Sequence, residues 1–434
     1  MDRDVMTRLR AWKTSAQRKP LLLEGARQVG KTWLMRAFGC AEYDNVAYID
    51  FEANPSLCTI FDGDIDVSRI LSQLQVATAT PIVPGRTLII LDEIQACPRA
   101  LTALKYVGEQ APGHHIAGAG SLLGVALHQD SSFPVGKVNF LDIGPLSFTE
   151  FLRALGEAGL ADALDPNGPP DWVFLAPFHD RLITLLRDYC FVGGMPEAVS
   201  SYASTRDYGT ARAIHEAILR AYDRDFSKHA PIGEVPRLRA VWASIPGQLA
   251  RERRFAYGEL GPGARARTHL AAIEWLTQAG VVHHVTRVSV PRLPLREYVD
   301  ESAFKLYLVD VGLLGALAGL GAPAVIEGDR LFTEFRGSLT EQYAATALVA
   351  ATGRTPHYWT NDGGTAEVDF VVQRERDIVP VEVRSSLNLK SKSLGVYDGK
   401  YAPDRLVRSS LAPYAAHGRL VDLPLYGLGS IGTV

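Results

Sequence analysis

Apolar runs of strand length alternate with helical patterns over the first third of the chain. The expected strands are 21–23, 45–52, 88–91, 114–121 and one within 135–155. Between them, apolar residues recur at helical spacing in 1–19 and 64–77, and a helix is expected from residue 32 to 38. Because a parallel strand covered on both faces reads as a continuous apolar run, residues 1–155 are predicted to form an α/β domain with a mainly parallel sheet.

The middle of the chain has mostly helical patterning. Residues 156–232 are expected to form a lid-like helical region, although the Pro-, Gly-, Ala- and Asp-rich stretch 160–178 predicts a variable loop. Gly193 and Gly194 break a helix, and Pro196 fits the first turn of the next one.

Residues 233–300 have the element order of a winged helix: a short helix, a turn, a second helix and a strand. The second helix begins with Arg265, Arg267 and His269, which suits contact with nucleic-acid phosphates. A lid or protein-contact module is the favoured alternative, because the chain as a whole has a net charge of -3 and is not basic.

Residues 301–434 change pattern again. A strand and a helix are expected in 303–320, a helix carrying Glu341 from 336 to 352, and then a hairpin of strands 367–372 and 378–384. Side chains alternate across a strand, so the hairpin can bring Asp369 beside Glu382.

Composition narrows the class of protein without identifying it. The 434 residues are 47% hydrophobic and 21% charged, as in a soluble globular protein of several domains. The four cysteines lack metal-binding spacing and suit a reducing compartment. The charged N-terminus lacks a signal-peptide core, and no apolar stretch approaches 18 residues, so we expect a cytoplasmic protein without a membrane partner.

The sequence GARQVGKT, residues 25–32, fits the G-x-x-x-x-G-K-[ST] pattern of a phosphate-binding loop between a strand and a helix. Its glycines let the main chain approach a polyphosphate, Lys31 would reach the β- and γ-phosphates, and the Thr32 hydroxyl would bind Mg²⁺. The alternative is an ordinary glycine turn. The predicted nucleotide-binding residues are Gly25, Ala26, Arg27, Gln28, Val29, Gly30, Lys31, Thr32 and Trp33.

A second element follows where the strand 88–91 ends in Asp92 and Glu93. In phosphate-loop ATPases an acid at this position holds Mg²⁺, so Asp92 is the predicted metal residue, acting through a water, and Glu93 the catalytic base. The alternative is a solvated strand end or helix cap. Ser121 ends the next strand and is a candidate γ-phosphate sensor, with a helix cap as the rival role.

The C-terminal acids suggest a second site. A helical acid, Glu341, followed by a strand acid, Asp369, and then Glu382 in an E-x-K-like position resembles restriction-endonuclease-like nucleases, in which such carboxylates bind Mg²⁺. Arg384 stands at the lysine position and can hold a phosphate, but it is a poor substitute for a compact ammonium. The alternative is a surface hairpin with solvated charges.

Over about residues 20–401 the chain resembles bacterial and archaeal AAA-type ATP-binding proteins with a C-terminal domain of unknown function. The motifs that carry the resemblance are GARQVGKT, LIILDEIQ, the GAGS strand end, FVGGMPEAV, RGSLTE, EVDFVV and VPVEVRSS. The resemblance implies a phosphate-loop ATPase, a winged-helix middle and a restriction-endonuclease-like end. Arg384 departs from it, because lysine is usual there.

Three functional hypotheses remain open. The first is Mg²⁺-dependent ATP binding and hydrolysis, with the nucleotide state coupled to the nuclease-like end. The second is an ATP-gated DNA or RNA nuclease. The third is an ATP/ADP switch that recruits a protein partner, with a catalytically dead nuclease fold; self-association also remains open. Arg99 and Arg153 are candidates for an arginine finger by position only.

Overall fold

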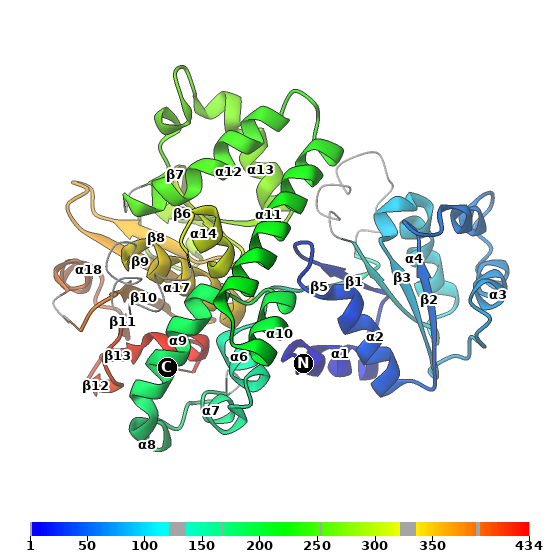
Figure 1. Cartoon of the computed structure of the whole chain (residues 1–434), viewed down its shortest axis with the longest axis horizontal. Helices are drawn as coiled ribbons and strands as arrows, with labels where there is room; N and C mark the ends of the chain where they lie inside the picture. The colour runs from blue at the N-terminus through cyan, green and yellow to red at the C-terminus, as the bar shows by residue number, and fades with distance from the viewer. Residues whose placement is uncertain are drawn as a thin grey trace. The chain divides into compact units, whose positions relative to one another are not determined.

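The computed structural model describes residues 2–120, 136–165, 168–251, 254–321, 336–387 and 391–433. The chain divides into two compact units (Figure 1). We call Asp2–Gly144 with Gln278–Val281 the N-terminal unit, and Pro145–Thr277 with Val282–Val434 the C-terminal unit.

A five-stranded, all-parallel sheet in the order β2-β3-β4-β1-β5 forms the centre of the N-terminal unit. The strands are β1 (Leu21–Glu24), β2 (Asn45–Asp50), β3 (Thr87–Asp92), β4 (His115–Ala119) and β5 (Asn139–Asp142). Every residue of β3 is buried, as the apolar run predicted. The α/β fold with a parallel sheet is therefore confirmed.

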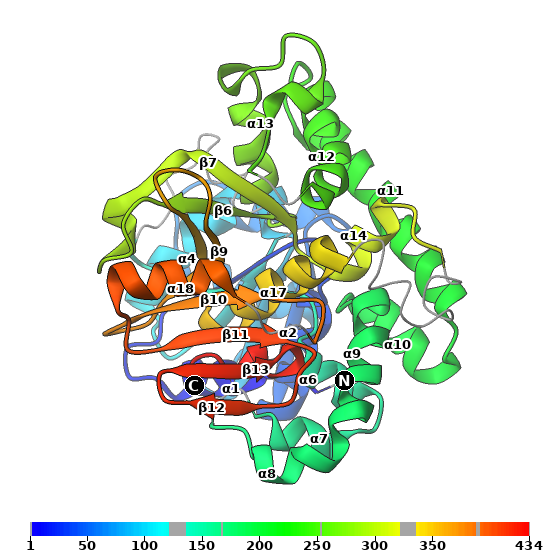
Figure 2. The same cartoon turned by 90° about the vertical axis from the view of Figure 1, so that its left-hand side faces the viewer.

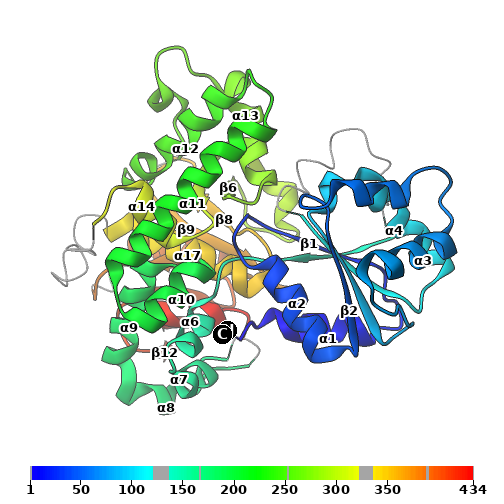
Figure 3. The ribbon, with the colours of Figure 1, turned by 45° about the vertical axis from the view of Figure 1, so that its right-hand side comes forward.

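Helices cover both faces of this sheet (Figure 3). Helices α1 and α2 lie on one face, and α3 and α4 lie on the other. The helical elements of the unit are α1 (Val5–Thr14), α2 (Lys31–Glu42), η1 (Pro55–Phe61), α3 (Val67–Thr78), η2 (Ile94–Ala96) and α4 (Pro98–Gln110).

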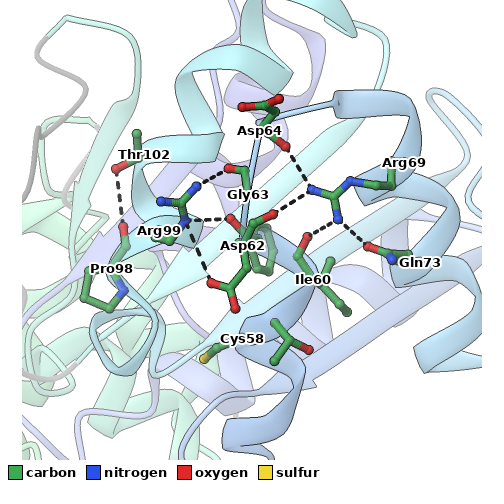
Figure 4. A network of polar contacts seen from close by, with 12 residues as sticks. Cys58, Ile60, Asp62, Gly63, Asp64, Arg69, Gln73, Pro98, Arg99 and Thr102 are labelled. Atoms are coloured by element: carbon green, nitrogen blue, oxygen red, sulfur yellow. Dashed lines mark hydrogen bonds and ion pairs between the residues drawn. The ribbon is translucent and has the colours of Figure 1, made fainter.

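Two arginines hold the segment that follows η1 (Figure 4). Arg69 of α3 donates to the main-chain oxygens of residues 60, 62 and 64, each at 3.0 Å. Arg99 of α4 donates to the oxygens of Phe61, at 2.8 Å, and Gly63. A loop without regular structure thus has its carbonyl groups satisfied by side chains from two helices.

An eight-stranded mixed sheet in the order β12-β13-β11-β10-β9-β8-β6-β7 is the main element of the C-terminal unit (Figure 2). The predicted hairpin is confirmed, because β9 and β10 pair antiparallel. The strands are β6 (Val282–Val288), β7 (Val299–Leu308), β8 (His357–Thr360), β9 (Glu367–Gln373), β10 (Ile378–Val383), β11 (Leu406–Ser410), β12 (Ala415–His417) and β13 (Leu420–Pro424).

Helices make up most of the remaining described part of this unit. They are α6 (Phe148–Ala154), α7 (Ala158–Ala163), α8 (Trp172–Leu175), η3 (Ala176–Phe178), α9 (His179–Val192), α10 (Pro196–Thr205), α11 (Tyr208–His229), α12 (Val235–Ala250), η4 (Tyr257–Leu260), α13 (Ala266–Gln278), η5 (Leu295–Tyr298), α14 (Val311–Leu317), α17 (Arg336–Thr352), α18 (Lys392–Tyr401) and η7 (Leu425–Ser430). The helix, turn, helix and strand order predicted for 233–300 is present; a winged-helix role stays a prediction.

The variable loop predicted for 160–178 is wrong in part, because this stretch contains the end of α7, all of α8 and η3. The Pro and Gly content of this stretch is typical of a loop, but two local features favour helices. Leu160 and Leu175 are buried, and the Asp171 carboxylate accepts a hydrogen bond from the Phe174 N–H at 2.9 Å and caps α8.

The glycine pair of the FVGGMPEAV motif is required by close packing. Gly193 has φ +66°, and a Cβ on it would lie 2.2 Å from Asp310 Oδ1. A Cβ on Gly194 would lie 2.1 Å from the Leu146 carbonyl oxygen. The buried Asp310 carboxylate accepts from the N–H groups of Gly194, at 2.6 Å, and Leu313, at 3.0 Å. This motif therefore has a structural role.

We expect Gly194→Ala to lower the free energy of unfolding by roughly 1–3 kcal/mol, because the added methyl group must displace backbone. The matched control is Gly395→Ala in α18, where a Cβ meets nothing within 4 Å. That change should raise stability by up to about 1 kcal/mol through helix propensity. Urea unfolding followed by tryptophan fluorescence compares the two, and equal stabilities would contradict the packing argument.

Candidate functional site

The loop between β1 and α2 is shaped by backbone conformations that favour glycine. The φ angles of Gly25, Gln28 and Gly30 are 136°, 65° and 89°. A Cβ on Gly25 would also lie 2.1 Å from the carbonyl oxygen of Ile143, just after β5. Gly25 is thus fixed by the neighbouring strand as well as by the expected approach of a phosphate. Gln28 carries the strain of a non-glycine residue at positive φ, a feature that gathers at ligand sites.

The side chains of the loop differ in their exposure to solvent. Ala26 and Val29 are buried and anchor the loop in the core, so only their main-chain groups can reach a ligand. Trp33 on α2 is 49% exposed, which leaves its indole free for a flat ligand. Arg27 is partly exposed and Gln28 is exposed.

Lys31 folds back over the loop. Its ammonium donates to the carbonyl oxygens of Gly25 and Ala26, both at 2.8 Å, and the residue is 6% exposed. Burial lowers the pKa of Lys31 to about 8, although Glu93 and Asp92 act to raise it. A buried cation held only by neutral carbonyl groups is well suited to receive an anion.

Asp92 and Glu93 meet this loop at the carboxyl edge of the sheet. The Asp92 carboxylate accepts from the Tyr48 hydroxyl at 3.0 Å and from the Glu93 N–H at 3.1 Å. Burial raises the pKa of Asp92, while hydrogen bonds from the side chains of Thr32 and Tyr48 lower it. Glu93, at φ 48°, accepts from the Gln95 amide. The structure thus gathers Lys31, Thr32, Asp92 and Glu93; their roles stay predictions.

Two residues of this edge were missed by the sequence analysis. Tyr48 binds Asp92 and lies under the Arg36 guanidinium, 4.9 Å from the ring centroid. Its place near the end of β2, the parallel neighbour of β3, was the available signal. Glu24, next to Asp142 in the pairing of β1 with β5, has its pKa raised to about 7 by burial and by that carboxylate.

The other candidates of the sequence analysis are not brought to this edge by the described residues. Ser121 lies outside the described residues. Arg99 donates to the loop after η1 (Figure 4), and Arg153 lies 3.8 Å from Asp162. Both arginines therefore have contacts within their own chain.

Arg265 and Arg267 are exposed at the start of α13, and the His269 ring lies against the Thr268 hydroxyl at 2.8 Å. Contact with phosphates stays a prediction for these three residues.

The C-terminal acids surround a lysine that the sequence analysis missed. Lys305 of β7 lies 2.8 Å from Glu367 of β9 and 3.2 Å from Glu341 of α17. Glu341 also accepts from the Tyr307 hydroxyl at 2.8 Å. The signal was a single charge inside the apolar run AFKLYL of this strand. We call Lys305, Tyr307, Glu341, Glu367 and Asp369 the Lys305 cluster.

Asp369 and Glu382 have partners of their own. Asp369 accepts from the Val383 N–H at 2.7 Å, and burial, together with Glu341, raises its pKa to about 7. Glu382 accepts from the Arg384 guanidinium, the Ser391 hydroxyl and the Leu394 N–H, the last at 3.2 Å. Among the residues that the structure describes, no three His, Cys, Asp or Glu side chains are arranged to hold a metal ion. The predicted metal set of Glu341, Asp369 and Glu382 is therefore not assembled here.

No helix in the described part of the chain is long and apolar enough to cross a membrane.

Three family models match successive parts of the chain. Residues 17–152 match an AAA domain, residues 183–324 a domain of unknown function (DUF8612), and residues 336–426 a domain of unknown function (DUF4143). No curated protein matches the chain.

Solved structures give only loose similarity. Aeropyrum pernix ORC1 in complex with DNA is 16% identical, with 74% of this chain and 92% of that chain covered and a TM-score of 0.26. The Thermotoga maritima RuvB Holliday junction branch migration motor is 15% identical over 66% and 89%, with a TM-score of 0.29. Pyrobaculum aerophilum Cdc6p is 11% identical over 70% and 87%, with a TM-score of 0.24. Superpositions this loose support no argument about function.

The buried Lys31 predicts how polyphosphate binding depends on pH. Its pKa is about 8 in the free protein, and a bound polyphosphate raises it, so binding takes up a proton above pH 8. We expect the affinity for ATP to be about tenfold weaker at pH 9 than at pH 7. Calorimetry in two buffers of different ionisation enthalpy measures both the affinity and the proton uptake.

The matched control is Lys31→Arg, which keeps its charge throughout this range and should lose the proton uptake. Binding by the wild type that is independent of pH from 7 to 9, without proton uptake, would contradict this assignment of Lys31.

Proposed function

Since the chain is an AAA-type ATP-binding protein with a C-terminal domain of unknown function, we propose that it hydrolyses ATP with Mg²⁺ and that Glu93 is the general base. The observation that carries the proposal is the approach of the Thr32 side chain to the Asp92 carboxylate, because it joins the loop after β1 to the acidic end of β3. An isolated glycine turn or a solvated strand end does not require this connection.

The residues present fit a magnesium–nucleotide complex. Lys31 provides a buried positive charge beside the loop. Thr32 and Asp92 are oxygen donors of the kind that Mg²⁺ prefers. When bound, Mg²⁺ would neutralise negative charge on the β- and γ-phosphates.

Each side chain of the site then has its own role in hydrolysis. Lys31 exchanges its contacts with the carbonyl groups of Gly25 and Ala26 for phosphate oxygens, with no need to enter from solvent. Glu93 accepts a proton from the attacking water, while the Gln95 amide orients its carboxylate. Tyr48 holds Asp92 in place through its hydroxyl group.

We expect Glu93→Gln to bind ATP with nearly unchanged affinity and to hydrolyse it at least about 100-fold more slowly, because the amide cannot accept the proton. Lys31→Ala should lose both binding and hydrolysis. Phosphate release and ATP binding are measured for each variant. Glu109→Gln, an exposed change on α4, is the matched control and should behave like wild type. Equal rates in all of these proteins would contradict the proposal.

We further propose that the nucleotide state is passed to the C-terminal unit. The chain passes from one unit to the other at Gly144–Pro145, Thr277–Gln278 and Val281–Val282. These covalent connections support the coupling. A nucleotide-dependent change in the N-terminal unit therefore acts on the other unit through several backbone connections. The nuclease-like end would then respond to ATP, as a gated enzyme or as a docking surface for a partner.

Hydrogen exchange of Glu93→Gln tests the coupling. We expect peptides from 145–277 and 282–321 to differ in protection between the ATP and ADP states, because this variant holds ATP without consuming it. Lys31→Ala is the control and should show no difference between the two nucleotides. Changes confined to residues 2–120 would contradict coupling.

A further inference from the structure

The Lys305 cluster brings together side chains from three separate elements. Lys305 and Tyr307 come from β7, Glu341 comes from α17, and Glu367 and Asp369 come from β9. Lys305 is 2% exposed, whereas the side chain of Glu367 is 32% exposed, so the ammonium lies at the inner end of the cluster. A fully buried lysine is tolerated only where opposite charges surround it, and here the carboxylates provide them.

Lys305 is held firmly in its charged form. Burial lowers its pKa, but Glu341, Tyr307, Glu367 and Asp369 more than compensate, and the net pKa lies well above its usual value. The ammonium also lies 5.6 Å from the centroid of the Tyr358 ring, which adds a favourable cation–π contact. The ammonium is therefore surrounded by two carboxylates and one aromatic ring.

Each carboxylate of the predicted metal set already accepts hydrogen bonds from the protein through at least one oxygen. Glu341 Oε2 accepts from both Lys305 and Tyr307. Asp369 Oδ2 accepts from the Val383 N–H. Glu382 accepts from Arg384 through Oε1 and from Ser391 through Oε2. Mg²⁺ demands a nearly octahedral oxygen shell. The Lys305 ammonium, 3.2 Å from Glu341 and 2.8 Å from Glu367, already takes the position between these carboxylates.

We propose that Lys305 is an internal cation that takes the place of a divalent metal ion among these carboxylates. The nuclease-like end then binds no metal at this cluster and does not cleave phosphodiesters there. Its acids instead connect β7, α17 and β9 through one buried charge. This inference is independent of the proposed ATP hydrolysis, which uses residues of the N-terminal unit only.

Titration of the nucleotide-free full-length protein with Mn²⁺ tests the proposal. For the wild type, we expect the number and affinity of bound ions to be unchanged by Asp369→Asn. Lys305→Met removes the ammonium but keeps most of the side-chain volume, and should gain one Mn²⁺ site that binds at least about tenfold more tightly than any wild-type site. Combining Lys305→Met with Asp369→Asn should remove the gained site.

Lys400→Met is the control for the loss of a positive charge elsewhere in the protein, because Lys400 is exposed and pairs with Asp362 at the surface. It should gain no tight site. Circular dichroism establishes that Lys305→Met is folded; if it is not, the comparison of wild type with Asp369→Asn still decides the matter. A wild-type Mn²⁺ site that Asp369→Asn abolishes would overturn the proposal, and so would a folded Lys305→Met that gains nothing.

Cleavage gives a second, independent measurement. Wild type and Asp369→Asn are incubated with plasmid DNA, single-stranded DNA and RNA in Mg²⁺ or Mn²⁺, with and without ATP. We expect no cutting that depends on Asp369, and cutting that this variant loses would overturn the proposal. Lys31→Ala separates the two proposals, because it should abolish ATP hydrolysis and leave every Mn²⁺ titration as in wild type.

Discussion

Parallel strand pairing is the constraint on which the N-terminal unit depends. In an all-parallel sheet the strands end at the same edge, so the loop after β1 and the acids after β3 meet although about 60 residues separate them. The Thr32–Asp92 contact is the direct product of that arrangement. Tyr48 reaches the same edge from β2, which pairs with β3 along its whole length.

The two buried lysines show how partners decide what a charge can do. Lys31 is held by neutral carbonyl groups, and its pKa falls to about 8. Lys305 is held by carboxylates, and its pKa rises well above the usual value. The first lysine is hydrogen-bonded by carbonyl groups alone and is suited to an incoming anion. The second is already ion-paired with Glu341 and Glu367.

Local sequence patterns predicted the parts of the structure whose chemistry is contiguous in the chain. GARQVGKT, the strand ending in Asp92 and Glu93, and the β9–β10 hairpin each carry their signal within one short stretch of chain. Lys305 could not be placed in the same way, because its partners come from the helix α17 and from β9, a strand that does not pair with β7. The short helix α8 was missed because its cap, Asp171, lies in a stretch whose composition is typical of a loop.

Arg384 shows the limit of motif reasoning at the C-terminal site. It lies directly after β10, at the position of the nuclease lysine, and the structure pairs it with Glu382, two residues away. The lysine among the acids comes instead from β7, which no hairpin motif includes. A motif predicts which side chains share a face of the sheet, but the other strands determine which residues those side chains contact.

One carboxylate, Asp310, serves two turns of the chain at once. It receives the Gly194 N–H from the turn between α9 and α10 and the Leu313 N–H from the first turn of α14. If the first turn of α14 opens, its N-cap Asp310 moves away and the buried Gly194 N–H loses its acceptor. If the turn after α9 opens, the buried Asp310 Oδ2 loses its donor, so the two turns should fray together as a single foldon. A segment that begins 116 residues further along the chain thus shares the local stability of the turn after α9.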